Sequence, residues 1–200
     1  MTEAEGPPKG GSGGAVGAPS RHPSFDVTGG VGREAAPTGT PKEPDDFMAY
    51  LLEGFESARL EDSHRQEVVR IDSGEYFEFM KAVKEAGFEL CSDVTVTDWF
   101  RHRRTRFDLV VNLVSLQHRR RLRVLVPLAG EEPTVASITP LWPGMAFGER
   151  EAYDMFGVVF EDHPDLTRIL MPDEWEGYPL RKDYGTGSVP VQFKESHKVT

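Results

Sequence analysis

Cysteine is nearly absent from this 200-residue chain, because Cys91 is the only one. A single thiol excludes an internal disulfide framework and any zinc or iron–sulfur site built from several cysteines of this chain. Excess positive charge is missing too, since 33 acidic residues face 23 basic ones and give a formal net charge of −10. That balance argues against a dedicated nucleic-acid binder, which needs an excess of Lys and Arg to meet phosphates.

Long apolar runs are also lacking, and no stretch approaches the roughly 20 residues needed to cross a bilayer. The chain begins Met-Thr-Glu-Ala-Glu-Gly, without the cationic start and apolar core of a secretory signal. We therefore expect an acidic, soluble protein of a reducing compartment, in which Cys91 is a buried structural thiol.

The first 46 residues have little to bury. They hold 10 Gly and 7 Pro, with Phe25 as the only aromatic residue. Such a segment cannot offset its chain entropy, so we predict a disordered tail over 1–46. An α+β domain is expected over 47–170, and an extended C-terminal interaction arm over 171–200.

Apolar periodicity predicts the elements of the domain. Helices are expected over 46–60, over about 73–86 with Asp72 and Glu75 as a capping box and Gly87 as the stop, and over 146–156 ending at Gly157. Strands are expected over 65–71, 88–100, 106–116, 121–128 and 136–142. The strands at 106–116 and 121–128 flank a short polar turn and predict an antiparallel hairpin. The fold class is therefore an α+β two-layer sandwich: a mixed sheet with this hairpin, and helices on one face.

Carboxylates and one imidazole gather late in the chain, and they raise the hypothesis of a metal or acid–base site. The candidates are Glu149, Glu151, Asp154 and His163. Only Glu151 and Asp154 have the spacing of two ligands on one helical face, and no nucleophile is evident. A salt-bridged helix that docks on a partner is the favoured interpretation, with His163 and Pro164 forming a turn or the start of a short helix.

Eight arginines fall between positions 101 and 123, among which Asp108 is the only acid. One hypothesis is an RNA-binding or anionic-lipid-binding hairpin over Arg101–Arg123. A protein-contact surface is favoured instead, because the chain is acidic and no stacking aromatics separate the arginines.

Residues 171–184 are too polar and too rich in proline for a helix or an inner strand. They nevertheless carry bulky side chains that are costly to leave in water, namely Trp175, Tyr178, Leu180 and Tyr184. An extended segment with such anchors is typical of a chain that lies on a partner's surface.

These residues also resemble a known family. Glu149-Arg150-Glu151-Ala152-Tyr153-Asp154-Met155-Phe156-Gly157-Val158, the stretch from His163-Pro164 to Arg168-Ile169-Leu170, and Pro179-Leu180-Arg181-Lys182-Asp183-Tyr184 are similar to the signature of the 30 kDa or C subunit of NADH-quinone oxidoreductase, respiratory complex I. The similarity runs from about Ile71 to Tyr184. Thr167 stands where the family usually has Arg, and Tyr178 where it usually has His.

The resemblance implies a non-catalytic subunit of the peripheral arm, which supports electron transfer from NADH to quinone coupled to proton translocation. It implies no cofactor and no metal in this chain, with FMN, iron–sulfur clusters and quinone on partner subunits. The implied partners are the quinone-pocket or D subunit, expected on a separate chain, and the neighbouring B and I subunits. It further implies a peripheral location on the cytoplasmic side of a bacterial membrane, reached only through the complex.

The interface residues implied by the signature share its charged, aromatic and turn-forming positions: Glu149, Arg150, Glu151, Asp154, Phe156, Gly157, His163, Pro164, Arg168, Trp175, Pro179, Arg181, Lys182 and Asp183. None of them is expected to be catalytic. The alternatives left open are an RNA-binding module that uses the arginine hairpin and a small metal-dependent hydrolase that uses the carboxylates.

Overall fold

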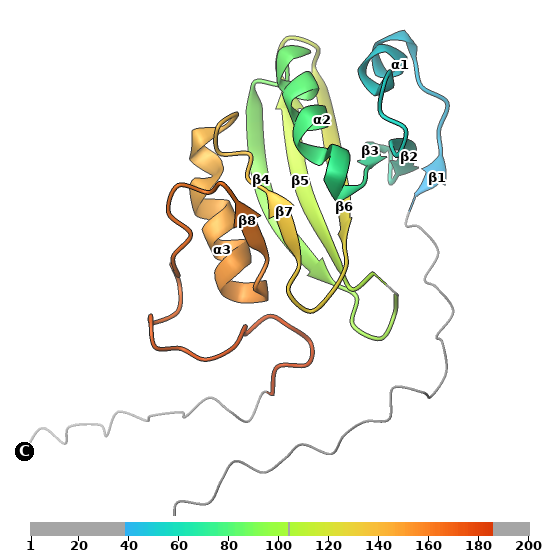
Figure 1. The fold of residues 1–200 in the computed structure, drawn as a ribbon. Coiled ribbons are helices and arrows are strands. Elements are labelled where there is room, and N and C mark those ends of the chain that lie inside the picture. Colours follow the sequence, from blue (N-terminus) through green and yellow to red (C-terminus); the bar gives the residue numbers. More distant parts are fainter. Residues whose placement is uncertain (1–38, 104, 186–200) are drawn as a thin grey trace, which may run out of the picture. The chain divides into compact units, whose positions relative to one another are not determined.

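The fold is built on a mixed six-stranded sheet (Figure 1). The computed structural model describes residues 39–103 and 105–185. The sheet order is β1-β2-β3-β6-β5-β4, formed by Thr40–Pro41, Arg59–Ser63, Gln66–Arg70, Arg120–Leu128, Phe107–Ser115 and Leu90–Asp98. Only the β3–β6 pair is parallel, and the other neighbours are antiparallel. The α+β class with a mixed sheet is thus confirmed.

Helices cover one face of this sheet, as Figure 1 shows. They are α1 (Asp46–Leu52), α2 (Ser73–Glu85) and α3 (Ala146–Phe156), which follows a 3-10 turn over Pro143–Met145. A small parallel pair, β7 (Thr134–Ala136) and β8 (Val159–Glu161), completes the helices and strands of the described residues. None of the helices described here is long and apolar enough to span a membrane.

Alternation along β5 and β6 places the core. Phe107, Leu109, Val111 and Leu113 are buried on the helix-covered face and pair with apolar residues of β6 in the register Val111–Val124. The predicted hairpin is confirmed. So is the end of α3, because Gly157 has φ +74°, a left-handed conformation that glycine adopts without a steric penalty.

The helix predicted over 46–60 is wrong beyond Leu52. Gly54 has φ +88° and turns the chain, and Phe55 then packs edge-to-face on Phe79 with 5.2 Å between ring centroids. Residues 59–63 form strand β2, because pairing with β3 satisfies their backbone groups.

The capping box predicted at α2 is also wrong. Asp72 stands at the N-cap but its side chain makes no capping hydrogen bond. The carboxylate of Glu75 instead accepts from the backbone N–H groups of Glu56 and Ser57, at 3.2 and 2.9 Å. Glu75 therefore fixes the loop before β2 rather than the start of its own helix.

Two further boundaries differ from the sequence prediction. Residues 40–41 pair with β2 and Asp45 caps α1, so the fold begins earlier than position 47. The strand predicted over 136–142 is wrong beyond Ala136, where β7 ends. The N–H of Ile138 donates to the carboxylate of Glu149 and not to a neighbouring strand. Most of the predicted tail, residues 1–38, and positions 186–200 of the arm lie outside the described residues.

Candidate functional site

Asp154 organises the segment that follows β8. It lies in the last turn of α3 with its side chain fully buried, and Arg168 Nη1 donates to its Oδ1 at 2.6 Å. Its Oδ2 accepts from the backbone N–H groups of Ile169, Leu170 and Met171, at 3.0, 2.7 and 2.9 Å. Burial alone would raise the pKa of this carboxyl, but these donors hold it below its usual range. One buried carboxylate thereby fixes four consecutive residues.

We call residues 167–185 the strap, since they lie against α3 and the end of β4. Arg150 attaches the start of the strap: its Nε donates to the Thr167 carbonyl at 3.0 Å. Its Nη2 donates to the Thr167 hydroxyl at 2.9 Å and to the Arg168 carbonyl at 2.8 Å. Thr167, a departure from the family pattern, therefore supplies a hydroxyl acceptor in place of a second cation.

The missing side chain of Gly157 leaves room for the middle of the strap to pack directly on the end of α3. A Cβ at this position would lie 2.5 Å from the ring of Tyr178 and 2.6 Å from Arg181 Nη2. The N–H of Leu180 donates to the Met155 carbonyl at 3.1 Å. Tyr178, the second departure from the family pattern, has the guanidinium of Arg181 4.5 Å from its ring centroid.

Arg106 fixes the end of the strap. It pairs with the buried Asp98 through Nε at 3.1 Å and Nη2 at 3.0 Å, and with Asp183 through Nη1 at 3.0 Å. Asp98 also accepts the N–H of Lys182 at 2.9 Å. Burial opposes ionisation of Asp98, but the bonds from Arg106 and Lys182 hold its pKa below the usual range. Hydrogen bonds from Arg106 likewise lower the pKa of Asp183.

Glu149 forms a separate buried cluster. Its carboxylate accepts from Ser137 Oγ at 2.6 Å and from the Ile138 N–H at 2.8 Å, and burial raises its pKa to about 7. His163 Nε2 lies 3.9 Å from this carboxylate and 3.1 Å from the Ala146 carbonyl. His163 Nδ1 accepts from the Asp165 N–H at 3.0 Å, so Nε2 carries the proton and donates to Ala146. The predicted turn is present, but no helix starts at Pro164.

The carboxylates proposed as a metal-dependent hydrolase site are therefore dispersed. Glu149 and His163 share one cluster, Asp154 is paired with Arg168, and Glu151 is exposed to solvent. Across 39–103 and 105–185, no three His, Cys, Asp or Glu side chains lie close enough to hold a metal ion. The geometry gives the hydrolase hypothesis no support.

Three of the arginines of the RNA-binding hypothesis are paired with acids of the same chain. Arg103 pairs with Asp108 at 2.6 Å and is nearly buried, and Arg106 is held by three acids. Arg120 pairs with Asp45 and Glu67. Arg104 lies outside the described residues. Arg103, Arg106 and Arg120 therefore already have acidic partners within the chain.

The strap carries apolar side chains on its outer side. Exposed fractions are 37% for Ile169, 61% for Leu170 and 52% for Leu180. Trp175 and Tyr178, predicted as anchors on a partner, are half-buried against their own chain, and their contact with a partner stays a prediction. The sequence did not indicate that Ile169 and Leu170 are exposed. It also did not indicate that Asp98 accepts a hydrogen bond from the strap backbone. No local pattern marks a contact of Asp98 across 84 positions.

The remaining signature residues also lie along the strap and α3. The Phe156 carbonyl accepts from Arg181 Nε at 2.5 Å, and Phe156 itself is half-buried. Pro179 and Arg181 are half-buried, and Lys182, the residue after Arg181, is exposed. Most of the signature thus lies around the last turn of α3. Glu149 and His163 lie at the first turn of this helix.

Comparison with known proteins agrees with this geometry. Residues 69–189 match the profile of the family described as respiratory-chain NADH dehydrogenase, 30 Kd subunit. The chain belongs to this family. The matched range contains the sheet core, α3 and the whole strap, and it agrees with the resemblance recognised from Ile71 to Tyr184.

Similar curated proteins are named as the C subunit of NADH-quinone oxidoreductase. The protein of Salinispora arenicola is 50% identical over 107 residues, and that of Saccharopolyspora erythraea is 46% identical over 107 residues. Each match covers 54% of this chain. The chain spans less than half the length of these relatives, 44% and 43% respectively.

Solved structures share the fold. A trypsin-resistant fragment of Nqo5 superposes with a TM-score of 0.55 and 33% identity, over 60% of this chain and 99% of the fragment. A chain of an archaeal respiratory membrane complex, the membrane-bound sulfane sulfur reductase, superposes with a TM-score of 0.62 over 76% of this chain and 96% of that chain. Because its identity is 21%, that second similarity shows the fold alone.

Proposed function

We propose that this chain is a non-catalytic subunit of the peripheral arm of NADH-quinone oxidoreductase. It supports electron transfer from NADH to quinone, coupled to proton translocation, by docking through the strap to the D subunit, which forms the quinone pocket. The B and I subunits are its further neighbours. One observation carries the proposal: buried charges fix the strap backbone while Ile169, Leu170 and Leu180 keep their apolar side chains in solvent.

This arrangement is suited to binding rather than to chemistry. Ordering a loop at the moment of association costs free energy, so a surface fixed in advance binds more tightly for the same contact area. Asp154 and Arg106 supply that order at the two ends of the strap. The apolar side chains then gain from burial in a partner's pocket, about 25 cal/mol for each Å² removed from water.

The charge of the strap region defines its partner further. Exposed acids flank the apolar residues: Glu161, Asp162, Asp165, Asp173, Glu174 and Glu176. Among the cations, Arg150 and Arg168 are bonded to the chain's own carbonyls and to Asp154, and Lys182 is exposed. The partner face that receives the strap therefore carries Lys or Arg around an apolar pocket.

Catalytic chemistry belongs to the partners in this proposal. FMN, iron–sulfur clusters and quinone are held by other subunits, and the isolated chain has no NADH–quinone activity. Cys91 supports this assignment, because it is buried and burial raises the pKa of its thiol to about 12. Such a thiol is a poor metal ligand and a poor nucleophile at neutral pH. The chain reaches the cytoplasmic side of the bacterial membrane through the complex alone.

Native purification through a tag on this chain tests the proposal. The expected eluate contains flavin, iron–sulfur clusters and the quinone-pocket subunit, with NADH–quinone reductase activity. The chain purified alone is expected to show no visible absorbance and no activity. An eluate that lacks the flavin and cluster subunits, or iron that stays with the isolated chain through dialysis, would contradict the proposal.

A further inference from the structure

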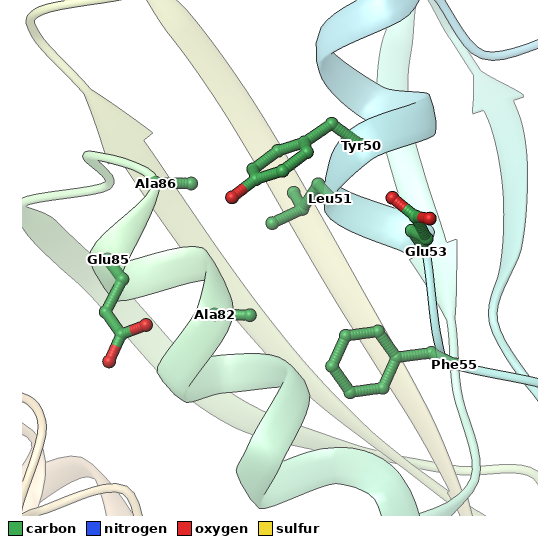
Figure 2. A pocket seen from close by; sticks show the side chains of 7 residues that line it. All are labelled: Tyr50, Leu51, Glu53, Phe55, Ala82, Glu85 and Ala86. Atoms are coloured by element: carbon green, nitrogen blue, oxygen red, sulfur yellow. The ribbon is translucent and has the colours of Figure 1, made fainter.

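A second surface lies away from the strap, between α1 and α2 (Figure 2). It is an open hollow of about 450 Å³, lined by Tyr50, Leu51, Glu53, Phe55, Ala82, Glu85 and Ala86. The strap contacts α3, which packs on β4 at one edge of the sheet. Helix α1 leads into β2 near the opposite edge, so a partner in this hollow would be contacted independently of the strap.

The walls of the hollow are apolar and unevenly filled. Figure 2 shows Ala82 of α2 and Ala86, the C-cap of that helix, pointing into the gap, opposite Leu51 and Phe55. Because an alanine contributes only a methyl group, the two helices leave space between them. Tyr50 extends across this space toward α2 and is 73% exposed, an unusual position for a large aromatic side chain.

Contacts beneath the hollow fix the segments that line it. Met48 is fully buried and anchors α1. Phe55 is fixed by its edge-to-face packing on Phe79, and the loop after it by Glu75. These contacts fix the positions of α1 and of Phe55 beside α2.

The charges around the hollow are acidic. Of the described residues that line it, the two that carry charge at neutral pH are Glu53 and Glu85. Two nearby cations are engaged elsewhere: Lys84 lies 4.9 Å from the centroid of the Trp142 ring, and Arg59 donates to the Glu56 and Ala58 carbonyls. Lys81 is exposed one turn before Glu85, so Glu53 is the carboxylate at the hollow without a cation one turn away on its own helix. An apolar occupant with positive flanks complements this surface.

We infer that the α1–α2 hollow docks a segment of a second polypeptide, in which an apolar side chain is flanked by Lys or Arg. The apolar side chain enters between Ala82, Ala86 and Leu51, beneath the ring of Tyr50. A cation next to it faces Glu53. This contact is additional to the strap and does not depend on which protein receives the strap.

Site-specific cross-linking in whole cells tests the inference on the full chain. Tyr50→p-benzoylphenylalanine places a photoreactive group at the mouth of the hollow. We expect one dominant adduct with another polypeptide, whose cross-linked peptide has an apolar residue within four positions of Lys or Arg. Adding Glu53→Lys should lower the yield about fivefold, the size expected for reversal at one exposed ion pair.

The matched control is Glu78→Lys, which reverses the charge of another exposed residue of α2 that does not line the hollow. It should leave the yield unchanged. The inference is overturned by an adduct with this chain's own terminal residues or with lipid, by an acidic or wholly polar cross-linked peptide, by no adduct, or by equal yields in the two charge variants. Because the adduct is read in cells, these outcomes stand whether or not the chain enters the respiratory complex.

Discussion

Arg106 and Asp183 form a two-bond ion pair across 77 positions of the chain, with Nη1–Oδ2 at 3.0 Å and Nη2–Oδ1 at 2.5 Å. The pair joins the start of β5 to the end of the strap. Asp98, at the end of β4, holds the same guanidinium from the buried side. The family signature Pro179–Tyr184 is therefore tied to the central sheet, and its position depends on a residue far outside the signature.

Substitution of Arg106 and of Asp183 should have unequal effects on stability. Arg106→Ala leaves the carboxylate of Asp98, 1% exposed, buried without its cation, and breaking a buried pair costs about 3–5 kcal/mol. Asp183→Ala removes a partner that is 39% exposed, so we expect about 1 kcal/mol or less. Urea unfolding of the full chain measures both free energies. Equal losses for the two variants would contradict the assigned hierarchy.

Asp154→Ala should release the strap backbone. The variant removes the acceptor of three backbone N–H groups and the partner of Arg168, so amide hydrogen exchange at Ile169–Met171 should rise at least about tenfold. Glu151→Ala, an exposed change on the same helix, should leave these amides unchanged. Similar exchange in both variants would show that the strap is ordered by something other than Asp154.

Two glycine substitutions should act in opposite directions. Gly157→Ala places a Cβ at φ +74° and 2.5 Å from the ring of Tyr178, so we expect a loss of more than about 1 kcal/mol. Gly74→Ala adds a methyl group in the first turn of α2 with no atom within 4 Å, and should stabilise by about 0.4–1 kcal/mol because the unfolded chain loses conformational freedom. Thermal unfolding of the two variants in one buffer makes the comparison. A tolerated Gly157→Ala would mean that the strap does not rest on this position.

Glu149→Gln should change how stability depends on pH. Burial raises the pKa of Glu149 from 4.5 to about 7, so the folded state holds this proton more tightly than the unfolded state. The resulting stabilisation is complete below about pH 4.5 and is lost as the pH rises through 7, a change of about 3 kcal/mol. Glutamine does not titrate, so the variant should become more stable relative to the natural chain as the pH rises. A difference in unfolding free energy that stays constant from about pH 4.5 to pH 8 would contradict the buried-acid assignment.

The elements set by local patterns were predictable from sequence. Alternation from Phe107 to Leu113 marked a half-buried strand, and Gly157 marked the end of α3; both are confirmed. Of residues 59–63, only 59 and 60 were predicted as helix, at the end of the helix expected over 46–60, and 61–63 were assigned to no element. Their strand conformation comes from pairing with β3, a contact that helical periodicity does not report.

The candidate site was predictable in its residues but not in its contacts. The signature named Asp154, Arg168 and Asp183, whereas their partners include backbone N–H groups and the distant Arg106. Glu75 shows the same limit, since its carboxylate binds the backbone of Ser57 rather than its own helix start. Hydrogen bonds between distant segments depend on the folded arrangement, and spacing along the chain does not specify them. The side chains that remain exposed on the strap could be identified only after those bonds were known.

The amount of assembled complex formed by Leu170→Asp tests the docking role of the strap most directly. Leu170 is 61% exposed, so the change should leave the melting temperature of the isolated chain nearly unchanged, while a charge in an apolar contact should reduce assembled NADH-quinone oxidoreductase at least about tenfold on native gels. Leu116→Asp, at a leucine 71% exposed in the turn after β5, is the matched control and should assemble normally. Activity per assembled complex should be the same for both variants and the natural chain. Normal assembly of Leu170→Asp, or normal assembly with activity per complex lost, would contradict the account.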